Sequence, residues 1–366
     1  MPIFKLQIAR GLTLVAGFTR GQVTNLDQMG EQAHGPSKVR RLPKWQKQHL
    51  GRVQSSQDLA RSDSSDIRPE NFIWMFGTMR VGSTWLGYMM EEQRGQERWR
   101  EPMVGMLFGS FFHHLGLGWN EWTLPYQYPH FIFSSRQKET WLNSIRQMVL
   151  EGARARFPRM SEKDYLIVQE PTGSVGAPWL MEALPESRMV FLLRDPRDVV
   201  ASMLDASKKG GWFYAEKYLI PYEFRAEEYL IDQKQLEGAP DSLAETSPTA
   251  FVEEWAKRYL RDVGNVKLAY EAHRGRKVLV RYEDLKADTL GTMKRIYSAL
   301  EIAVDEEELA RAVAKHAWER IPDDKKGEGK VLRKATPGGW REDLSPEEVA
   351  VVERITAPLL KEYYSK

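Results

Sequence analysis

A glycine-bearing loop with a single cation is the part of the sequence whose residue types most clearly suggest chemistry. The loop runs from Gly77 to Trp85 (GTMRVGSTW), directly after a short apolar stretch, and a helical spacing of apolar residues follows it. At such a strand–loop–helix junction, backbone N–H groups and the helix N-terminus converge on an anion. Gly82 allows the backbone to approach a ligand closely, while Ser83 and Thr84 add hydroxyl donors in the first helical turn. The loop therefore predicts a phosphate-binding site.

The cation of this loop is not where a nucleoside triphosphate needs it. The glycine spacing imitates the pattern G-x-x-x-x-G-K-S/T, but Ser83 occupies the place of the lysine that reaches the outer phosphates. Arg80, inside the loop, is placed to meet the bridging oxygen and the transferred group of a shorter donor. An ordinary strand–turn–helix with an exposed arginine is the alternative for this motif alone.

A second cation and a second hydroxyl follow another apolar stretch. Arg194 stands just before a predicted helix, Pro196 suits the first turn of that helix, and Ser202 lies farther along it. One cation at a strand end and one hydroxyl from the following helix can clamp a phosphate monoester. The alternative is a helix cap in which Asp195 and Arg197 are surface charges.

A third basic segment lies near the C-terminus, in Leu332–Arg341 (LRKATPGGWR). Its adjacent cations, Arg333 and Lys334, precede a Pro-Gly-Gly turn, and a polar stretch comes before them. This pattern predicts a flexible flap that closes on an anion. A solvated basic loop is the alternative.

Together, the three motifs resemble those of the PAPS-dependent sulfotransferase family, where PAPS is 3′-phosphoadenosine 5′-phosphosulfate. The family's 5′-phosphosulfate loop, a basic residue followed by x-G-S/T-T and then W or L, matches at Arg80–Trp85. Its 3′-phosphate signature, R-x-P-x-D-x-x-x-S, matches from Arg194 to Ser202. Its R-K-G-x-x-G-x-W-K segment begins at Arg333, with Ala335 in place of the first glycine. The resemblance implies PAPS as the sulfuryl donor, PAP as the product and no requirement for a metal.

The resemblance also assigns roles to the matching residues. Arg80 becomes the catalytic cation. Trp85 and Tyr282 are the candidates for stacking on the adenine, and Tyr282 belongs to the family's Y-E-D motif. Trp318 is a weaker candidate. The residues that the match places on the nucleotide are Arg80, Val81, Gly82, Ser83, Thr84, Trp85, Arg194, Ser202, Tyr282, Arg333 and Lys334.

Two glutamates are candidates for the general base that an acceptor hydroxyl needs. Glu101 is expected at the far end of the first helix, a position comparable to that of a catalytic glutamate in many family members. Glu170 follows a predicted strand, near the place where small-molecule cytosolic members carry a histidine. Either carboxylate could instead pair with one of the arginines. His113 and His114 lie in an apolar stretch and are further candidates.

The elements that must position these residues are strands followed by helices. Short apolar runs without polar interruption are typical of strands that are covered on both faces. Such runs occur at Phe72–Phe76, Tyr165–Val168, Met189–Leu193 and Lys277–Val280. Because a helix-like stretch follows each run, the sequence predicts an α/β fold with a doubly wound, mainly parallel sheet flanked by helices. The family resemblance implies a fold like that of P-loop nucleotide kinases.

Composition changes along the chain predict its domain organisation. Residues 1–70 read as a partly disordered N-terminal extension, and residues 71–366 as a folded domain with an insertion around 205–248. The resemblance implies that this domain is the sulfotransferase domain. The segment Met106–Trp141 is dense in aromatic residues and is interrupted by glycines and prolines. It favours an acceptor with an apolar or aromatic part, either free or tethered to a carrier protein. A packing insertion is the alternative.

The overall composition excludes several classes of protein. The 366 residues include 53 Lys and Arg against 51 Asp and Glu, so the net charge of +2 gives no sign of nucleic-acid binding. With 0 cysteines the chain has no disulfide and no thiolate chemistry. No apolar stretch approaches the roughly 20 residues of a membrane span. We expect a cytoplasmic protein; the oligomeric state stays open.

The sequence thus predicts an enzyme that transfers a sulfuryl group from PAPS to a hydroxyl, or less often an amine. The acceptor is a small-molecule, lipidic, carbohydrate or carrier-tethered compound. Two alternatives stay open. One is an ATP-dependent P-loop kinase with a degenerate loop, and the other is a catalytically inactive nucleotide-binding module.

Overall fold

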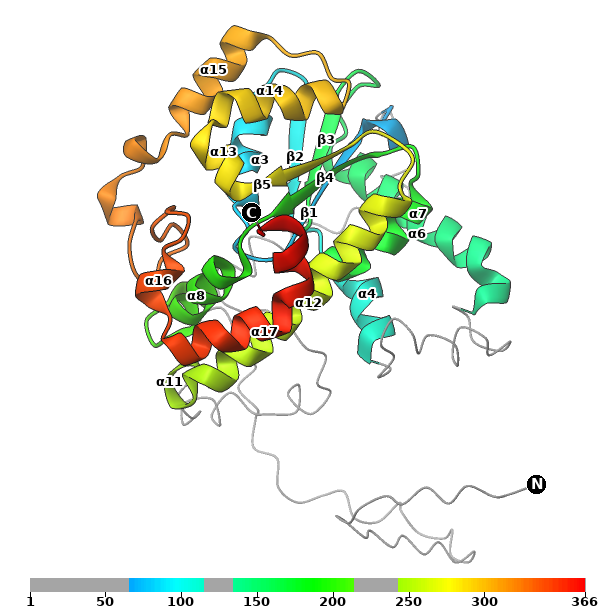
Figure 1. Cartoon of the computed structure of the whole chain (residues 1–366). Coiled ribbons are helices and arrows are strands. Elements are labelled where there is room, and N and C mark those ends of the chain that lie inside the picture. Colours follow the sequence, from blue (N-terminus) through cyan, green and yellow to red (C-terminus); the bar gives the residue numbers. More distant parts are fainter. Residues whose placement is uncertain (1–65, 115–133, 214–242, 366) are drawn as a thin grey trace, which may run out of the picture. The chain divides into compact units, whose positions relative to one another are not determined.

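The computed structural model describes residues 66–114, 134–213 and 243–365. Its centre is a sheet of five parallel strands in the order β2-β3-β1-β4-β5 (Figure 1). The strands are β1 (Phe72–Phe76), β2 (Gln96–Arg100), β3 (Tyr165–Gln169), β4 (Arg188–Leu193) and β5 (Lys277–Arg281). This sheet, with helices around it, confirms the predicted fold class.

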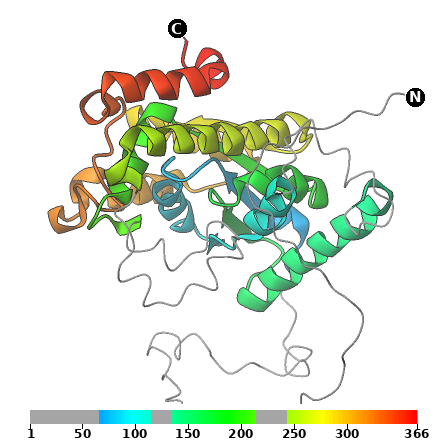
Figure 2. The same ribbon diagram turned by 90° about the horizontal axis from the view of Figure 1, so that it is seen from below.

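Helices flank the sheet, as Figures 1 and 2 show. Helix α12 lies against β4 and is covered by α17, whereas α3 lies against β2 and β3. The helices are α3 (Ser83–Glu91), α4 (Val104–His114), α6 (Lys138–Arg156), α7 (Ala177–Ala183), α8 (Pro196–Ser207), α11 (Leu243–Thr246), α12 (Pro248–Ala272), α13 (Tyr282–Ala287), α14 (Thr289–Ala299), α15 (Glu306–Lys315), α16 (Trp340–Asp343) and α17 (Pro346–Tyr363).

The burial of each strand follows from its place in the sheet. Every residue of β1 and of β4 is buried, because other strands and helices cover these inner strands on all sides. The edge strand β5 alternates between buried and partly buried residues. Long unbroken apolar runs therefore mark the inner strands of this sheet, as expected for parallel strands.

Strand β2 is the one strand of the sheet that the sequence analysis missed. Its residues Gln96–Arg100 (QERWR) are mostly charged, and only the first is buried. At the edge of the sheet such polar residues can face solvent or reach neighbouring helices. The β2 side chain Arg98, for example, forms an ion pair with Glu91 of α3. The apolar signal used to recognise strands is consequently absent from β2.

The strand order brings two predicted motifs to the same edge of the sheet. Strands β1 and β4 are adjacent, and Phe76 pairs with Phe191 near their carboxyl ends. A Cβ atom on Gly77 would lie 2.4 Å from the carbonyl oxygen of Leu192, so this first loop position needs glycine. Ligands of open parallel sheets bind where neighbouring strands lead to opposite sides, and β1 with its neighbours forms such a point.

Several predictions concern segments that lie wholly or partly outside the described residues. Most of the predicted extension 1–70, part of the insertion around 205–248 and most of the aromatic segment lie outside them. The insertion overlaps α8, which continues through Ser207. Among the described helices, none combines the length and apolar character that crossing a bilayer requires.

Candidate functional site

The loop between β1 and α3 contains two residues with left-handed backbone. Gly82 has a φ of +93° and directly precedes α3. Arg80 has a φ of +71°, a conformation that costs an L-residue about 1–2 kcal/mol. A guanidinium nitrogen of Arg194, Nη1, donates to the carbonyl oxygen of Arg80 at 2.9 Å. The second predicted motif therefore holds the backbone of the first.

Gly82→Ala should destabilise the protein more than Gly210→Ala. Both glycines have a left-handed backbone, with φ of +93° and +86°. A Cβ on Gly82 would lie 2.6 Å from the ring of Tyr282, whereas no described atom lies within 4 Å of a Cβ on Gly210. We expect the free energy of unfolding to fall by about 1 kcal/mol for Gly210→Ala and by roughly 2–4 kcal/mol for Gly82→Ala. Denaturant titration of both variants measures this difference, and equal losses would contradict the close approach of Tyr282.

The second motif lies directly against the first. Arg80 Nε donates to Ser202 Oγ at 2.9 Å, and the Arg194 guanidinium lies 4.4 Å from the centre of the Tyr282 ring. The hydroxyl of Tyr259 donates to the carbonyl oxygen of Arg194 at 2.7 Å, which fixes the backbone there. Arg194 Nε is buried and has no hydrogen-bond partner among the described residues. A buried donor without a partner is available to a ligand.

The two arginines create a strongly positive site. Burial and, to a smaller extent, the charge of Arg194 together lower the pKa of Arg80 to about 10. The Arg80 guanidinium therefore stays cationic at neutral pH. An anion between them would offset the unfavourable burial and the mutual repulsion of these charges.

The third motif contributes a flap, which we define as residues 333–341. Arg333 Nη2 lies 2.7 Å from Asp343 Oδ1, and its Nε lies 3.4 Å from Asp205 Oδ2. Lys334 Nζ lies 2.8 Å from the same oxygen of Asp343. The two cations of the flap are thus paired with carboxylates of α8 and α16.

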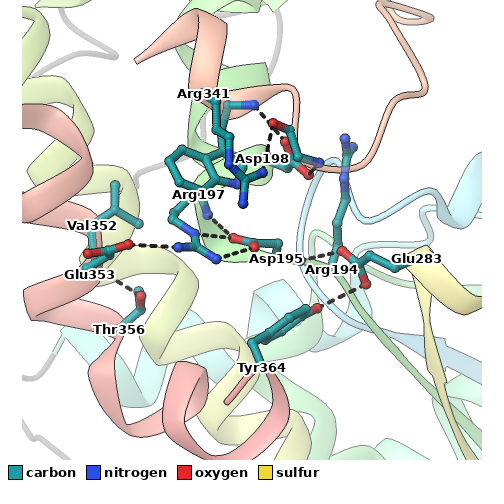
Figure 3. Close-up of polar contacts among 12 residues, drawn as sticks. Arg194, Asp195, Arg197, Asp198, Glu283, Arg341, Val352, Glu353, Thr356 and Tyr364 are labelled. Atoms are coloured by element: carbon teal, nitrogen blue, oxygen red, sulfur yellow. Dashed lines mark hydrogen bonds and ion pairs between the residues drawn. The ribbon is translucent and has the colours of Figure 1, made fainter. Parts of the chain in front are cut away.

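The flap is anchored to α8 through backbone groups. The carboxylate of Asp198 accepts N–H donors from Gly338 at 2.7 Å and from Trp340 at 3.0 Å. The guanidinium groups of Arg197 and Arg341 lie 4.2 and 4.4 Å from the Trp340 ring. Figure 3 shows Asp198 and both arginines around this anchor. The helix that carries Ser202 and the flap therefore form one connected unit.

The start of α8 is also tied to the C-terminal part of the chain. Glu283 accepts the backbone N–H of Asp195 at 2.9 Å and the Tyr364 hydroxyl at 3.2 Å, as Figure 3 shows. Arg197 lies between the carboxylates of Asp195 and Glu353, both at 2.7 Å. These contacts hold the position from which Arg194 extends.

All three predicted segments line one pocket of about 410 Å³. Of the residues predicted to contact a nucleotide, its wall contains Arg80, Gly82, Ser83, Thr84, Trp85, Arg194, Ser202, Tyr282, Arg333 and Lys334. Val81 is fully buried and does not line the pocket. The structure therefore brings the predicted residues together, including pairs more than 250 positions apart such as Arg80 and Arg333.

Aromatic side chains form one part of the wall. Trp85 and Tyr282 lie edge to face, with ring centres 6.2 Å apart. Trp85 Nε1 donates to the carbonyl oxygen of His316 at 2.9 Å, which fixes the indole. Trp318, the weaker candidate, also lines the pocket, and so does Lys286.

The two glutamates predicted as bases lie beside each other, and neither lines this pocket. Arg100 of β2 pairs with Gln169 of β3, so Glu101 and Glu170 follow at neighbouring strand ends. The backbone N–H of Glu101 donates to the carbonyl oxygen of Gln169 at 2.8 Å. Strand β3 lies between β2 and β1, which places Glu170 nearer than Glu101 to the loop that carries Arg80.

Glu170 acts as an acceptor for the backbone at the start of α4. Its carboxylate accepts N–H donors from Met103 at 3.1 Å and from Gly105 at 2.9 Å, and the side chain is fully buried. Burial and, to a smaller extent, the charge of Glu101 together raise the pKa of Glu170 to about 8. The carboxyl thus shapes the connection that carries Glu101.

Glu101 combines an unusual backbone with an unusual pKa. Its φ is +48°, and burial raises its pKa to about 7 although hydrogen bonds from Thr172 oppose the shift. Its Oε2 is buried without a hydrogen-bond partner among the described residues. A carboxyl with a pKa near neutrality suits a general base. His113 and His114 belong to α4, but their side chains lie outside the description.

The carboxylates that accompany the flap were not predicted from the sequence. Asp205 follows Ser202 by three positions on α8, a spacing that places both on one face of a helix and was the available signal. Asp343 gave no comparable signal, because its pairing with Arg333 depends on how the flap folds back.

Comparison with known proteins identifies one family. The family model described as "Sulfotransferase family" matches residues 73–306. No curated protein matches in a sequence comparison.

Similar solved structures include sulfotransferase STF9 from Mycobacterium avium, with 14% identity, a TM-score of 0.49 and coverage of 86% of this chain and 81% of that one. Mouse sulfotransferase SULT7A1, complexed with PAP, has 15% identity, a TM-score of 0.46 and coverage of 85% and 91%. The sulfotransferase domain of the olefin synthase from Synechococcus PCC 7002 has 16% identity, a TM-score of 0.41 and coverage of 80% and 96%.

Proposed function

The chain belongs to the sulfotransferase family, and from this premise we propose that it transfers a sulfuryl group from PAPS to an acceptor hydroxyl and releases PAP. One observation carries the proposal: a single pocket is lined by the β1–α3 loop, by Arg194 with Ser202, and by the flap. An adenine nucleotide with two separate phosphate groups needs cations at two places and an aromatic surface for its base. The pocket offers all three.

In this assignment each part of the pocket meets one part of the donor. The β1–α3 loop binds the 5′-phosphosulfate, with hydroxyl groups of Ser83 and Thr84 at the start of α3. Arg194, Ser202 and the flap cations bind the 3′-phosphate. The buried Arg194 Nε, which has no partner among the described residues, supports this role. Trp85, Tyr282 and Trp318 form the surface for the adenine.

Catalysis in this proposal is mainly positioning and charge stabilisation, as in phosphoryl transfer. The acceptor oxygen forms a bond to sulfur while the bond from sulfur to the bridging oxygen breaks, and the electron pair stays on the 5′-phosphate of PAP. Arg80 stabilises the charge that develops on that bridging oxygen. The carboxylate of Glu101 takes the acceptor's proton, and Glu170 positions the backbone around it. The raised pKa of Glu101, about 7, supports this division.

The acceptor in this proposal has an apolar or aromatic part. Helix α4 follows Glu101 closely and exposes half of Leu107. Exposed apolar surface on α4 suits a small-molecule, lipidic or carbohydrate acceptor, or one tethered to a carrier protein. The aromatic segment that follows α4 in the sequence favours the same class.

PAP should bind the protein and ATP should not. PAP at about 100 times its dissociation constant should stabilise the fold by about 2.7 kcal/mol, which thermal-shift titration detects. ATP lacks a 3′-phosphate, and Ser83 stands where a triphosphate loop has lysine. Stabilisation by ATP with magnesium and not by PAP would support a kinase instead. Transfer from PAPS to a mixed panel of hydroxyl acceptors then separates an enzyme from an inactive PAP-binding module.

A further inference from the structure

A buried glutamine connects the sheet to the hydroxyl groups of the β1–α3 loop. Gln169, the last residue of β3, is 1% exposed. Its Nε2 donates to Ser83 Oγ and to Thr84 Oγ1, both at 3.4 Å. We propose that Gln169 is a positioning residue that orients the protons of these two hydroxyls toward the 5′-phosphate. The inference rests on the proposed function, because it assumes that the loop binds that phosphate.

The orientation of the Gln169 amide follows from its other neighbour. The Oε1 and Nε2 atoms of a glutamine are assigned from their hydrogen-bond partners. Arg98 Nη1 donates to Gln169 Oε1 at 3.1 Å. A guanidinium has donors only, so it must face the oxygen of the amide, and the NH₂ group must face the loop.

Arg98 is itself held in place on both sides. Its guanidinium forms an ion pair with Glu91 and lies 4.3 Å from the centre of the Tyr88 ring. Helix α3 also leaves room for the contact, because a Cβ on Gly87 would lie 3.0 Å from Gln169 Oε1 and 3.0 Å from Arg98 Cδ. Glu91 and Tyr88 therefore hold Arg98 against the side chain of Gln169.

This arrangement decides the direction of the hydroxyl protons. Each of the two amide N–H groups of Gln169 meets one hydroxyl oxygen, and each hydroxyl accepts through a lone pair. The single proton of each hydroxyl is then free to donate elsewhere. Ser83 and Thr84 line the pocket, where a phosphate would supply acceptor oxygens. Donors that are oriented before the ligand arrives bind a charged group more tightly than donors that must reorient.

The test compares two ligands that differ only in the 5′-phosphate. PAP carries both phosphates, and adenosine 3′-monophosphate lacks the one that the loop would bind. Gln169→Glu places a carboxylate beside Arg98, but this carboxylate accepts from the hydroxyls and draws their protons away from the pocket. Gln169→Met keeps a similar volume and removes both donors without adding charge. Gln93→Met is the matched control, since Gln93 is 3% exposed and its side chain has no hydrogen-bond partner among the described residues.

Calorimetric titration should show a loss that is specific to PAP. We expect the affinity for PAP to fall on the order of tenfold or more for Gln169→Glu, and by about threefold to tenfold for Gln169→Met. Affinity for adenosine 3′-monophosphate should stay within about twofold in both variants, and Gln93→Met should change neither affinity.

Three results would each be decisive. If Gln169→Met binds PAP as tightly as the wild type, the inference is wrong, because a loss in Gln169→Glu then reflects only charge repulsion. If both ligands weaken equally in the Gln169 variants, the residue supports the fold and not the hydroxyl protons. If the wild-type protein binds no PAP, the proposed function itself fails, and that outcome is distinct from the other two.

Discussion

Arg80→Ala is expected to abolish sulfuryl transfer while PAP remains bound. Arg80 lines the pocket, and burial lowers its pKa only to about 10, so it is charged at the pH of the reaction. A cation that acts on charge developing in the transition state contributes mainly to turnover, and its loss should lower kcat on the order of 1,000-fold. In the proposed binding mode, PAP keeps its contacts with Arg194, Ser202 and the flap. Sulfate transfer from PAPS and calorimetric titration of PAP measure the two quantities.

Two further variants serve as controls for this result. Arg80→Lys keeps the charge but loses the planar guanidinium, so we expect an intermediate loss of turnover. Arg194→Ala should show the opposite pattern, with PAP affinity reduced about 10- to 100-fold, because it removes the cation assigned to the 3′-phosphate. Arg80→Ala with undiminished turnover would remove Arg80 from the mechanism.

Glu101→Gln should reduce turnover on the order of 100-fold or more and remove the acid limb of the pH profile. The carboxyl of Glu101 has a pKa raised to about 7 by burial. A general base works only when it is deprotonated, so wild-type kcat should rise as the pH increases through about 7. The amide in the variant cannot accept the proton at any pH. Initial rates between pH 5.5 and 8.5, on the order of one assay per half unit, test both statements.

Glu170→Gln is the comparison that separates the two glutamates. Glu170 accepts backbone N–H groups at the start of α4, so its loss should lower stability and should leave a pH-dependent rate in place. If Glu170→Gln removes the pH-dependent limb and Glu101→Gln does not, the two assignments are reversed.

The raised pKa of Glu101 also predicts how stability depends on pH. A carboxyl whose pKa rises from 4.5 to about 7 on folding holds its proton more tightly in the folded state. The free energy of unfolding should therefore decrease as the pH rises from about 4.5 to 7. Glu101→Gln removes this contribution, and denaturant titrations across the interval should show a smaller decrease.

The sequence predicted those parts of the fold whose signal is local. Strands β1, β3, β4 and β5 appeared within about one residue of their ends, because each is an apolar run between polar segments. Strand β2 was missed, since its charged residues obtain their partners from α3 and β3. The presence of Arg98 in a strand is explained by its contacts with Glu91 and Gln169, which the local sequence does not reveal.

In the candidate site, too, the features with a local sequence signal were predictable and those that depend on distant contacts were not. The three motifs were visible because glycines, cations and hydroxyls occur at fixed spacings within short segments. Their convergence on one pocket depends on the strand order. The pairing of Arg333 with Asp205 and Asp343 depends on contacts between segments that are distant in the sequence or that fold back on each other. No local pattern contains that information.

The carboxylates that accompany the flap's cations have a consequence for selectivity. Because Arg333 and Lys334 already have Asp205 and Asp343 as internal counter-ions, an incoming anion must displace an existing ion pair. A small ion such as inorganic phosphate gains little from this exchange. A ligand whose other end is held at Arg80 presents its second phosphate at a high effective concentration and so competes successfully.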